Sequence, residues 1–409
     1  MPSMRPQSLF APRGLLALFV LLSWPTIEGI SLSKEQDAEF ERELMTINKP
    51  AVKTIKTKHG DIYDCVNIHE QPALDNPLLK NHKVQMTPSS ALLENLRSSS
   101  SNKSSSIANP AKIGLEIECP KGTVVIQRTS KEDLIRAKYH FRRHLLDDSN
   151  PESGYGYDFA GIYLKPDANK KYYGVGATIT IYQPVASSQQ ISAAIIRLES
   201  GGPGYGGYVE TGWMVNPDLY NDNRARLFTK WSQVNNGRVS GCYNTYCPGF
   251  VVQSSSIPLN AYFANISKVN GIQYEYRFSI KQDSSTGNIW AFINNGNVAL
   301  GYWPKELFTN LGNGADTVFW GGMVYSNLPN SPPMGSGLFK NGNYGNTCYM
   351  RQMSVRTVPG APFVTADDAL VLYKNSRCFD AAGYENVGSW GYRFLFGGEG
   401  RDNDHCRYG

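Results

Sequence analysis

Apolar and polar residues alternate along much of the second half of the chain. In the stretch 274–281, Tyr, Tyr, Phe and Ile alternate with Glu, Arg, Ser and Lys, which predicts a strand with one buried face. Residues 172–182 alternate in the same way. Further strand candidates are residues 190–198, 289–293, 298–303 and 318–325. The dipeptide Asn295-Gly296 is a strong hairpin signal. No long helical pattern interrupts these strands, so the sequence predicts a mainly β fold, an antiparallel β-sandwich.

The first part of the chain has a mixed pattern. Residues 34–47 have helical composition, and two β-compatible runs around the His59-Gly60 turn predict a short hairpin. Residues 122–128 predict another strand, and the run from Thr129 to Glu132 resembles a capping box that opens a helix ending near Leu146. This part therefore predicts a small α+β unit, which ends near residue 147, before the β domain.

The N-terminus has the features of a secretory signal. Arg5 and Arg13 form a basic region, and the nine apolar residues 14–22 are too short to span a membrane. We expect cleavage near Gly29. The mild net charge of +5 comes from scattered basic residues, which favours neither nucleic-acid nor membrane binding. We therefore expect a secreted protein, and the sequons at Asn102 and Asn265 are candidate glycosylation sites.

The seven cysteines are expected to form disulfides in an oxidising compartment. Local spacing favours the pairs Cys242–Cys247 and Cys378–Cys406. A Cys65–Cys119 pair is less strongly indicated by spacing and would leave Cys348 without a partner.

The distribution of histidines limits the chemistry of the β domain. The sequence has no histidine between His144 and His405. This argues against a Ser-His-Asp or Cys-His catalytic site and against a His-liganded zinc site. No phosphate-binding or dinucleotide motif occurs either, so we expect no metal and no cofactor. Carboxylate chemistry remains, with Glu210, Glu275 and Glu306 as the glutamates of the stretch 200–360. We expect Glu275 to be solvated.

The stretch around Glu210 is the strongest candidate for a site. A glycine-rich loop, residues 201–207, precedes a short strand that carries Glu210, and glycines allow close approach of a ligand to the backbone. Trp213 is among the aromatic residues that could form the walls of a groove. The plainer interpretation is a glycine-rich sheet edge with one exposed glutamate.

Longer motifs identify a family. The runs YVETGWMVNP, RLFTKWS, GCYNTYCPGF, GYWPKELF, WGGMV and MGSG, and CPKGTVVIQRTSKEDLIRA before them, resemble the plant neprosin family of secreted glutamic endopeptidases, which cleave next to proline. The resemblance implies a two-sheet antiparallel sandwich with a substrate cleft. It also implies an activation peptide that covers the cleft until acid triggers its removal. The implied organisation is a signal peptide at 1–29, an activation peptide at 30–147 and a β-sandwich domain at 148–409.

One position departs from the family pattern. The resemblance implies two catalytic glutamates, of which Glu210 matches the first, in the YVETGW motif. The second ends a Trp-Gly-Gly-Glu motif, which here reads Trp320, Gly321, Gly322, Met323. A thioether is a weak acceptor and cannot transfer a proton. Glu210 would then lack the partner with which acid and base roles are divided.

The sequence thus predicts a secreted peptidase homologue whose activity is lost or reduced. Its cleft, lined by Glu210, Trp213, Trp320, Gly321 and Gly322, would bind an extended proline-containing peptide or protein, or the protein's own propeptide. One alternative is an active glutamic prolyl endopeptidase, made as an acid-activated zymogen, with another carboxylate in place of the missing one. The other is a sandwich that binds carbohydrate or the cell wall through its many Tyr and Trp side chains. The cell wall or apoplast is the expected location.

Overall fold

The computed structural model describes most of the chain after the predicted signal peptide. The described residues are 33–93, 108–113, 117–148, 156–201, 206–294, 298–339, 342–366, 370–401 and 406, with the backbone alone for 140–148. The predicted signal peptide, the sequon at Asn102, the dipeptide Asn295-Gly296 and most of the glycine-rich loop lie outside them.

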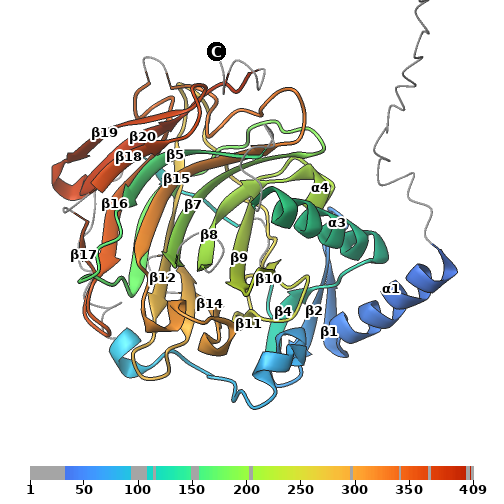
Figure 1. Ribbon diagram of the computed structural model, residues 1–409. Helices are drawn as coiled ribbons and strands as arrows, with labels where there is room; N and C mark the ends of the chain where they lie inside the picture. The colour runs from blue at the N-terminus through green and yellow to red at the C-terminus, as the bar shows by residue number, and fades with distance from the viewer. Residues whose placement is uncertain are drawn as a thin grey trace, which may run out of the picture.

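Two large antiparallel sheets form the body of the protein (Figure 1). The seven-stranded sheet has, in spatial order, β10 (Arg238–Tyr243), β9 (Arg226–Asn235), β8 (Gly207–Val215), β7 (Gln190–Ser200), β15 (Thr317–Ser326), β5 (Gly156–Leu164) and β18 (Leu370–Lys374). The main path of the ten-stranded sheet is β11 (Val251–Val252), β14 (Val298–Trp303), β13 (Ile289–Ile293), β12 (Tyr274–Gln282), β6 (Gly174–Thr180), β16 (Cys348–Arg356), β20 (Tyr392–Gly397) and β19 (Asp380–Asn386). β17 (Val364–Thr365) pairs with β16, and β3 (Asn109–Pro110) pairs with β12.

The hydrophobic core lies between these two sheets. Trp213 of β8 and Trp320 of β15 are fully buried, and their indole N–H groups donate to backbone carbonyls of β6, to Thr180 at 2.8 Å and to Gly176 at 3.2 Å. A buried indole N–H usually has an acceptor, and these two bonds join the seven-stranded sheet to β6 of the other. The predicted two-sheet, mainly β fold is confirmed.

The N-terminal part forms a separate small layer beside β9 and β10 (Figure 1). β1 (Ala51–Lys56), β2 (Ile62–Asn67) and β4 (Thr123–Gln127) make a three-stranded antiparallel sheet. Its helices are α1 (Lys34–Ile47) and α3 (Lys131–Asp148), with short 3-10 turns η2 (Pro72–Asp75) and η3 (Pro77–Leu79). The other short helices belong to the sandwich: α4 (Pro217–Tyr220), η4 (Lys305–Leu307), η5 (Leu311–Asn313) and η6 (Gly388–Trp390). Among the described residues, no helix is both long and apolar enough to cross a membrane.

Capping side chains define where the two long helices begin. Ser33 and Gln36 form a reciprocal capping box at α1. At α3 the box joins Ser130 and Asp133, whose side chains each accept a hydrogen bond from the other's backbone N–H. The sequence-based expectation placed this box one residue earlier, at Thr129 and Glu132.

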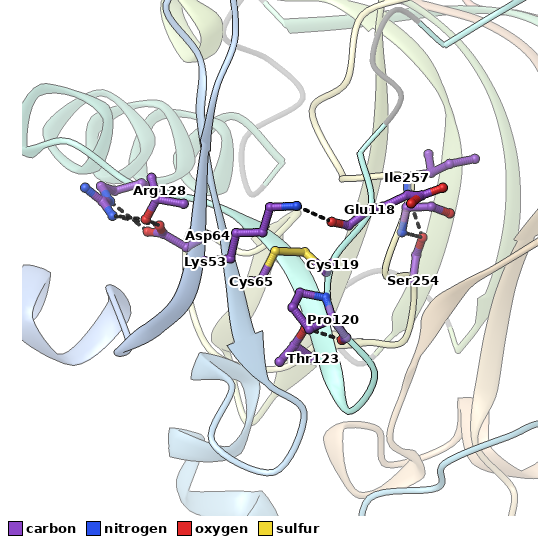
Figure 2. The surroundings of a disulfide bond; sticks show 12 residues. Lys53, Asp64, Cys65, Glu118, Cys119, Pro120, Thr123, Arg128, Ser254 and Ile257 are labelled. Atoms are coloured by element: carbon purple, nitrogen blue, oxygen red, sulfur yellow. Dashed lines mark hydrogen bonds and ion pairs between the residues drawn. A yellow bond between two sulfur atoms is a disulfide. The ribbon is translucent and has the colours of Figure 1, made fainter.

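Three disulfides join the cysteines that spacing favours. Cys65 pairs with Cys119, Cys242 with Cys247 and Cys378 with Cys406, while Cys348 is a buried free thiol. Figure 2 shows the first of them, which joins β2 to the residues before β4, next to the hydrogen bond from Lys53 to the Glu118 carbonyl.

The N-terminal part is attached to the sandwich by buried polar contacts. The Gln71 side chain is almost fully buried and bonds both backbone groups of Val252, the N–H at 2.7 Å and the carbonyl at 3.1 Å. The Gln85 amide reaches Asp283, Thr286 and Asn288. A second apolar cluster joins residues of the N-terminal part to the outer face of the ten-stranded sheet; it contains Ala73, Leu92, Val251, Trp290, Phe292 and Tyr302.

Candidate functional site

Glu210 lies in the middle of the seven-stranded sheet, between two cations. Its direct cross-strand partners are Arg197 on β7 and Lys230 on β9. Directly opposite residues in antiparallel strands point to the same face, so the three side chains share the face that turns away from the core. We call this surface the Glu210 face. The predicted alternative of an exposed glutamate is wrong, because Glu210 is fully buried.

Arg197 holds one oxygen of Glu210 with two donors. Its Nε and Nη2 lie 2.8 and 2.7 Å from Oε2 of Glu210. No described residue forms a hydrogen bond with the other oxygen, Oε1, which is also buried. Burial alone would lower the pKa of the Arg197 guanidinium, but the charges of Glu210, Tyr208 and Glu199 raise it above its usual range. The guanidinium therefore keeps its charge, and Oε1 of Glu210 is left as an acceptor.

Aromatic rings surround both cations. The Arg197 guanidinium lies 4.4 Å from the ring centroid of Tyr208 and 5.3 Å from that of Phe159. The Lys230 ammonium lies 4.9 Å from the ring of Tyr243 and 5.5 Å from that of Tyr157. Tyr157 belongs to β5, which three strands separate from β9 in the sheet order, so the sheet must curve around this face. Glu210 thus lies in a concave, aromatic-lined surface.

Met323 shares the Glu210 face but is not directly opposite Glu210. The row through Glu210 and Arg197 crosses β15 at Phe319, and Met323 is four residues further along that strand. The even spacing keeps Phe319 and Met323 on one face. The direct partner of Met323 on β5 is Phe159, whose ring contacts the Arg197 guanidinium at 5.3 Å. Curvature thus brings the neighbourhood of Met323 against the Glu210–Arg197 pair.

Glycines form the row between Glu210 and Met323. Gly212 on β8, Gly321 on β15 and Gly161 on β5 lie in register, with Ile195 of β7 between the first two. A Cβ atom on Gly321 would lie 2.4 Å from the carbonyl oxygen of Ala160, so this position needs glycine. The ring of Phe319 packs over Gly321 and Gly161, so these glycines make room for an aromatic side chain on the Glu210 face.

Three of the predicted cleft residues belong to the opposite face. Trp213, Trp320 and Gly322 alternate with the residues of the Glu210 face and point toward the ten-stranded sheet. A Cβ on Gly322 would meet the side chain of Met334 at 2.4 Å, which shows how tightly that side is packed. The prediction that the two tryptophans line the cleft with Glu210 is wrong, because period-two alternation puts them in the core. Gly321 is the predicted glycine that lies on the Glu210 face.

The remaining carboxylates differ in their suitability as partners of Glu210. Glu275 is buried and paired with Arg351, so the expectation that it is solvated is wrong. Glu306 lies on η4, 3.4 Å from Nδ1 of His82. Asp316 pairs with Lys171. Glu199 shares a cation with Glu210, since its Oε2 lies 3.6 Å from Nη1 of Arg197.

Helix α3 lies close to this site. It contacts α4, β10 and β5, and a small cavity beneath it is lined by Ala137 and Lys138 of α3 and by Tyr243 of β10. Tyr243 is directly opposite Lys230, which is directly opposite Glu210. The N-terminal part therefore borders the cavity at the Tyr243 end of the row, with Tyr243 and Lys230 between it and Glu210.

The side chains around Glu210 offer charged and aromatic contacts to a ligand. Within the described ranges, no group of three or more His, Cys, Asp or Glu side chains could hold a metal ion. A guanidinium and an ammonium beside a carboxylate acceptor can bind polar backbone groups, and the aromatic rings can pack against an apolar chain. Sequence reasoning missed Arg197 and Lys230, although each is a single basic residue within a strand-like apolar run.

Comparisons with known proteins match two regions of the chain. The family model described as Neprosin matches residues 188–399, and the model described as Neprosin activation peptide matches residues 54–153. The chain is also similar to a crystal structure of Scytalido-glutamic peptidase with a peptide-based transition state analog, at 13% identity and a TM-score of 0.30, over 59% of this chain and 97% of that one. SCP-B, a member of the Eqolisin family of peptidases in complex with the tripeptide Ala-Ile-His, matches at 12% identity and a TM-score of 0.28, over 59% of this chain and 97% of that one.

Proposed function

Because the chain belongs to the neprosin family, we propose that it is a secreted peptidase homologue that binds extended, proline-containing peptides on its Glu210 face and hydrolyses them poorly or not at all. The expected location is the cell wall or apoplast. The proposal includes a signal peptide at 1–29, an activation peptide at 30–147 and a sandwich domain at 148–409.

The observation that carries the proposal is the identity of residue 323. By family resemblance this position would hold the second catalytic carboxylate, and it holds a methionine that is fully buried. Splitting a peptide bond with carboxylates needs one group to activate water and one to donate a proton. Glu210 retains one free oxygen for such a role, but Met323 has no exchangeable proton. Loss of one member of such a pair removes most of the catalysis that both supply.

Peptide binding has separate support in the shape of the face. An extended chain binds by backbone hydrogen bonds, with side chains pointing alternately toward and away from the surface. The Phe319 ring covers Gly321 and Gly161, so a bound chain would pack against aromatic surface there. The rings of Tyr157, Phe159 and Tyr208 provide apolar surface of the kind on which proline-rich segments dock.

The N-terminal part supports synthesis as an inactive precursor. Helix α3 lies over the cavity that Tyr243 lines, at the end of the row that leads through Lys230 to Glu210. In this proposal its removal opens access to the face from the β10 edge. Acid favours removal in the family that the chain resembles, and we expect the same trigger here.

The alternative function is an active glutamic endopeptidase. Glu199 favours it, because this acid shares Arg197 with Glu210 and could replace the missing carboxylate. Binding of carbohydrate through aromatic rings is a third possibility, for which the rings around Lys230 would be the platform.

The test is cleavage of a quenched proline-containing peptide at acidic pH, before and after removal of residues up to about 147. Wild type, Met323→Glu, Glu210→Gln and Glu199→Gln are compared, and binding of the same peptide is measured in parallel. We expect the wild type to bind without turnover and Met323→Glu to gain turnover.

Two results would contradict the proposal. If the wild type turns the peptide over and Glu210→Gln does not, the protein is an active enzyme. If Glu199→Gln also loses turnover, Glu199 is the second acid. Retention on polysaccharide with no peptide binding would favour the carbohydrate-binding alternative.

A further inference from the structure

A second buried cationic group lies on the outer face of the ten-stranded sheet, away from Glu210. Lys281 of β12 and Arg356 of β16 are both cross-strand partners of Gly174 on β6, so they flank this glycine on one face. Arg277, four residues before Lys281 on β12, lies over Gly176. All three cations come from strands whose alternate residues pack in the core.

Among the residues that the structure describes, no acid forms an ion pair with buried Lys281 or Arg356. Their exposed fractions are 2% and 0%. None of the three guanidinium nitrogens of Arg356 has a hydrogen-bond partner among the described residues. Arg277 differs, because it donates to the Gln352 carbonyl at 2.6 Å and to the Ser354 hydroxyl at 2.8 Å.

The carboxylate that acts on Arg356 already accepts hydrogen bonds from other groups. Asp283 is the carboxylate that acts on Arg356. Its Oδ2 accepts from the Gln85 side chain and the Ser89 backbone, and its Oδ1 accepts from Ser285. These bonds leave Asp283 poorly placed to neutralise a guanidinium that it does not touch.

The ring of Phe363 is a weak substitute for a counter-ion. Its centroid lies 4.9 Å from the Lys281 ammonium and 5.5 Å from the Arg356 guanidinium, so both cations share it. A cation–π contact contributes about 0.5–2 kcal/mol, whereas an uncompensated buried charge costs several kcal/mol. A lysine can lose its proton when buried, but an arginine keeps its charge.

We propose that Arg356 and Lys281 form a binding site for a small inorganic anion, roofed by Phe363. Planar guanidinium groups bind oxyanions through parallel N–H donors, and the ammonium adds a third direction of approach. Gly174 lets these groups lie close together, since a Cβ there would be only 3.2 Å from Cβ of Arg356 and 3.3 Å from the Phe363 ring. The site is independent of the function proposed for Glu210.

Anion binding should strengthen as the pH falls. Burial, followed by repulsion from Arg356 and Arg277, lowers the pKa of Lys281 to about 6. The neighbouring elements β6 and β13 bring Gly174 and Trp290 against it, and the loop before β17 brings Phe363, none of which is charged. Below that pH the site gains a positive charge, and a bound anion would in turn favour the protonated lysine.

The test is thermal unfolding of the full-length protein with increasing inorganic phosphate, sulfate or chloride, at pH 5.5 and pH 8. A bulky sulfonate buffer salt keeps the ionic strength constant. A ligand that binds only the folded state raises Tm along a saturable curve. We expect such a rise for at least one of the three anions, larger at pH 5.5, and a stoichiometry of one by titration calorimetry.

Arg356→Met and Lys281→Met should each lose the saturable rise. Lys374→Met is the matched control, because it removes one positive charge from an exposed pair with Asp380 and should keep the rise. If Arg356→Met does not fold, Lys281→Met and the calorimetry still decide. No rise beyond that of the sulfonate salt, or an equal rise in wild type and both site variants, would overturn the proposal.

Discussion

Replacing Arg197 by methionine tests whether the Glu210 face depends on its buried ion pair. Methionine keeps much of the length and apolar contact of the side chain but removes both donors to Oε2 of Glu210. Glu210 would then be a fully buried carboxylate that keeps only Lys230 as a neighbouring cation. We expect a large loss of stability.

The expected magnitude follows from the two contacts. A hydrogen bond to a charged group contributes about 1.5–3 kcal/mol, so two give about 3–6 kcal/mol. Removing one partner of a buried pair costs about 3–5 kcal/mol in measured cases. Lys230 offers partial compensation, which places the expected loss near the lower limit, about 3 kcal/mol. That corresponds to roughly a hundredfold change in the folding equilibrium.

Urea denaturation followed by tryptophan fluorescence measures this loss. The midpoint should fall in Arg197→Met with an unchanged slope. The double variant with Glu210→Met should recover most of the loss, because replacing a buried pair by apolar groups is often neutral. Arg401→Met is the control, since its pair with Glu399 is exposed and should contribute less than about 1 kcal/mol. Equal, small losses in Arg197→Met and Arg401→Met would refute the reasoning.

Three other changes have definite expected outcomes. Gly321→Ala should lower Tm far more than Gly312→Ala in circular dichroism melts, because the added Cβ would lie 2.4 Å from the Ala160 carbonyl but 3.6 Å from its nearest neighbour, Lys305 Cβ, at Gly312. Cys119→Ser should cost about 4 kcal/mol on the loop-entropy model for a sequence separation of 54, and limited proteolysis should cut the N-terminal hairpin first. In anion-free buffer, the pKa of Lys281 is about 6 in the folded state and 10.5 in the unfolded chain. Between these two pH values the unfolded chain therefore binds more protons than the folded protein. The free energy of unfolding should therefore rise with pH across that window. Lys281→Met should reduce this dependence by up to one bound proton, measured from urea midpoints at a series of pH values.

Local patterns predicted most of the elements on which the site is built. The alternation at 274–281 corresponds to β12, and the helical composition of 34–47 corresponds to α1. The motif that contains Glu210 lies on β8, as its β-branched and aromatic residues favour. These features depend on neighbours in sequence, so the sequence holds the information directly.

The error about Trp213 and Trp320 was avoidable from the same information. Positions 210 and 213 differ by an odd number on one strand, as do 320 and 323, so each tryptophan must face away from its partner. Aromatic residues near a candidate catalytic residue suggest a lined cleft, but alternation overrides proximity in sequence. The alternation of side chains along a strand predicts Gly321, rather than Trp320, on the face of Met323.

The electrostatics of both faces, in contrast, depend on register between distant strands. Arg197 meets Glu210 because β7 pairs with β8, and Lys281 meets Arg356 because both β12 and β16 pair with β6 at Gly174. One buried arginine thus has a carboxylate and the other has none among the described residues. The local sequence does not indicate which of the two arginines has a buried carboxylate, since that carboxylate lies on a neighbouring strand. A buried arginine therefore pairs with a glutamate on one sheet and, on our proposal, binds an anion on the other. The pairing of the strands determines which of the two roles it has.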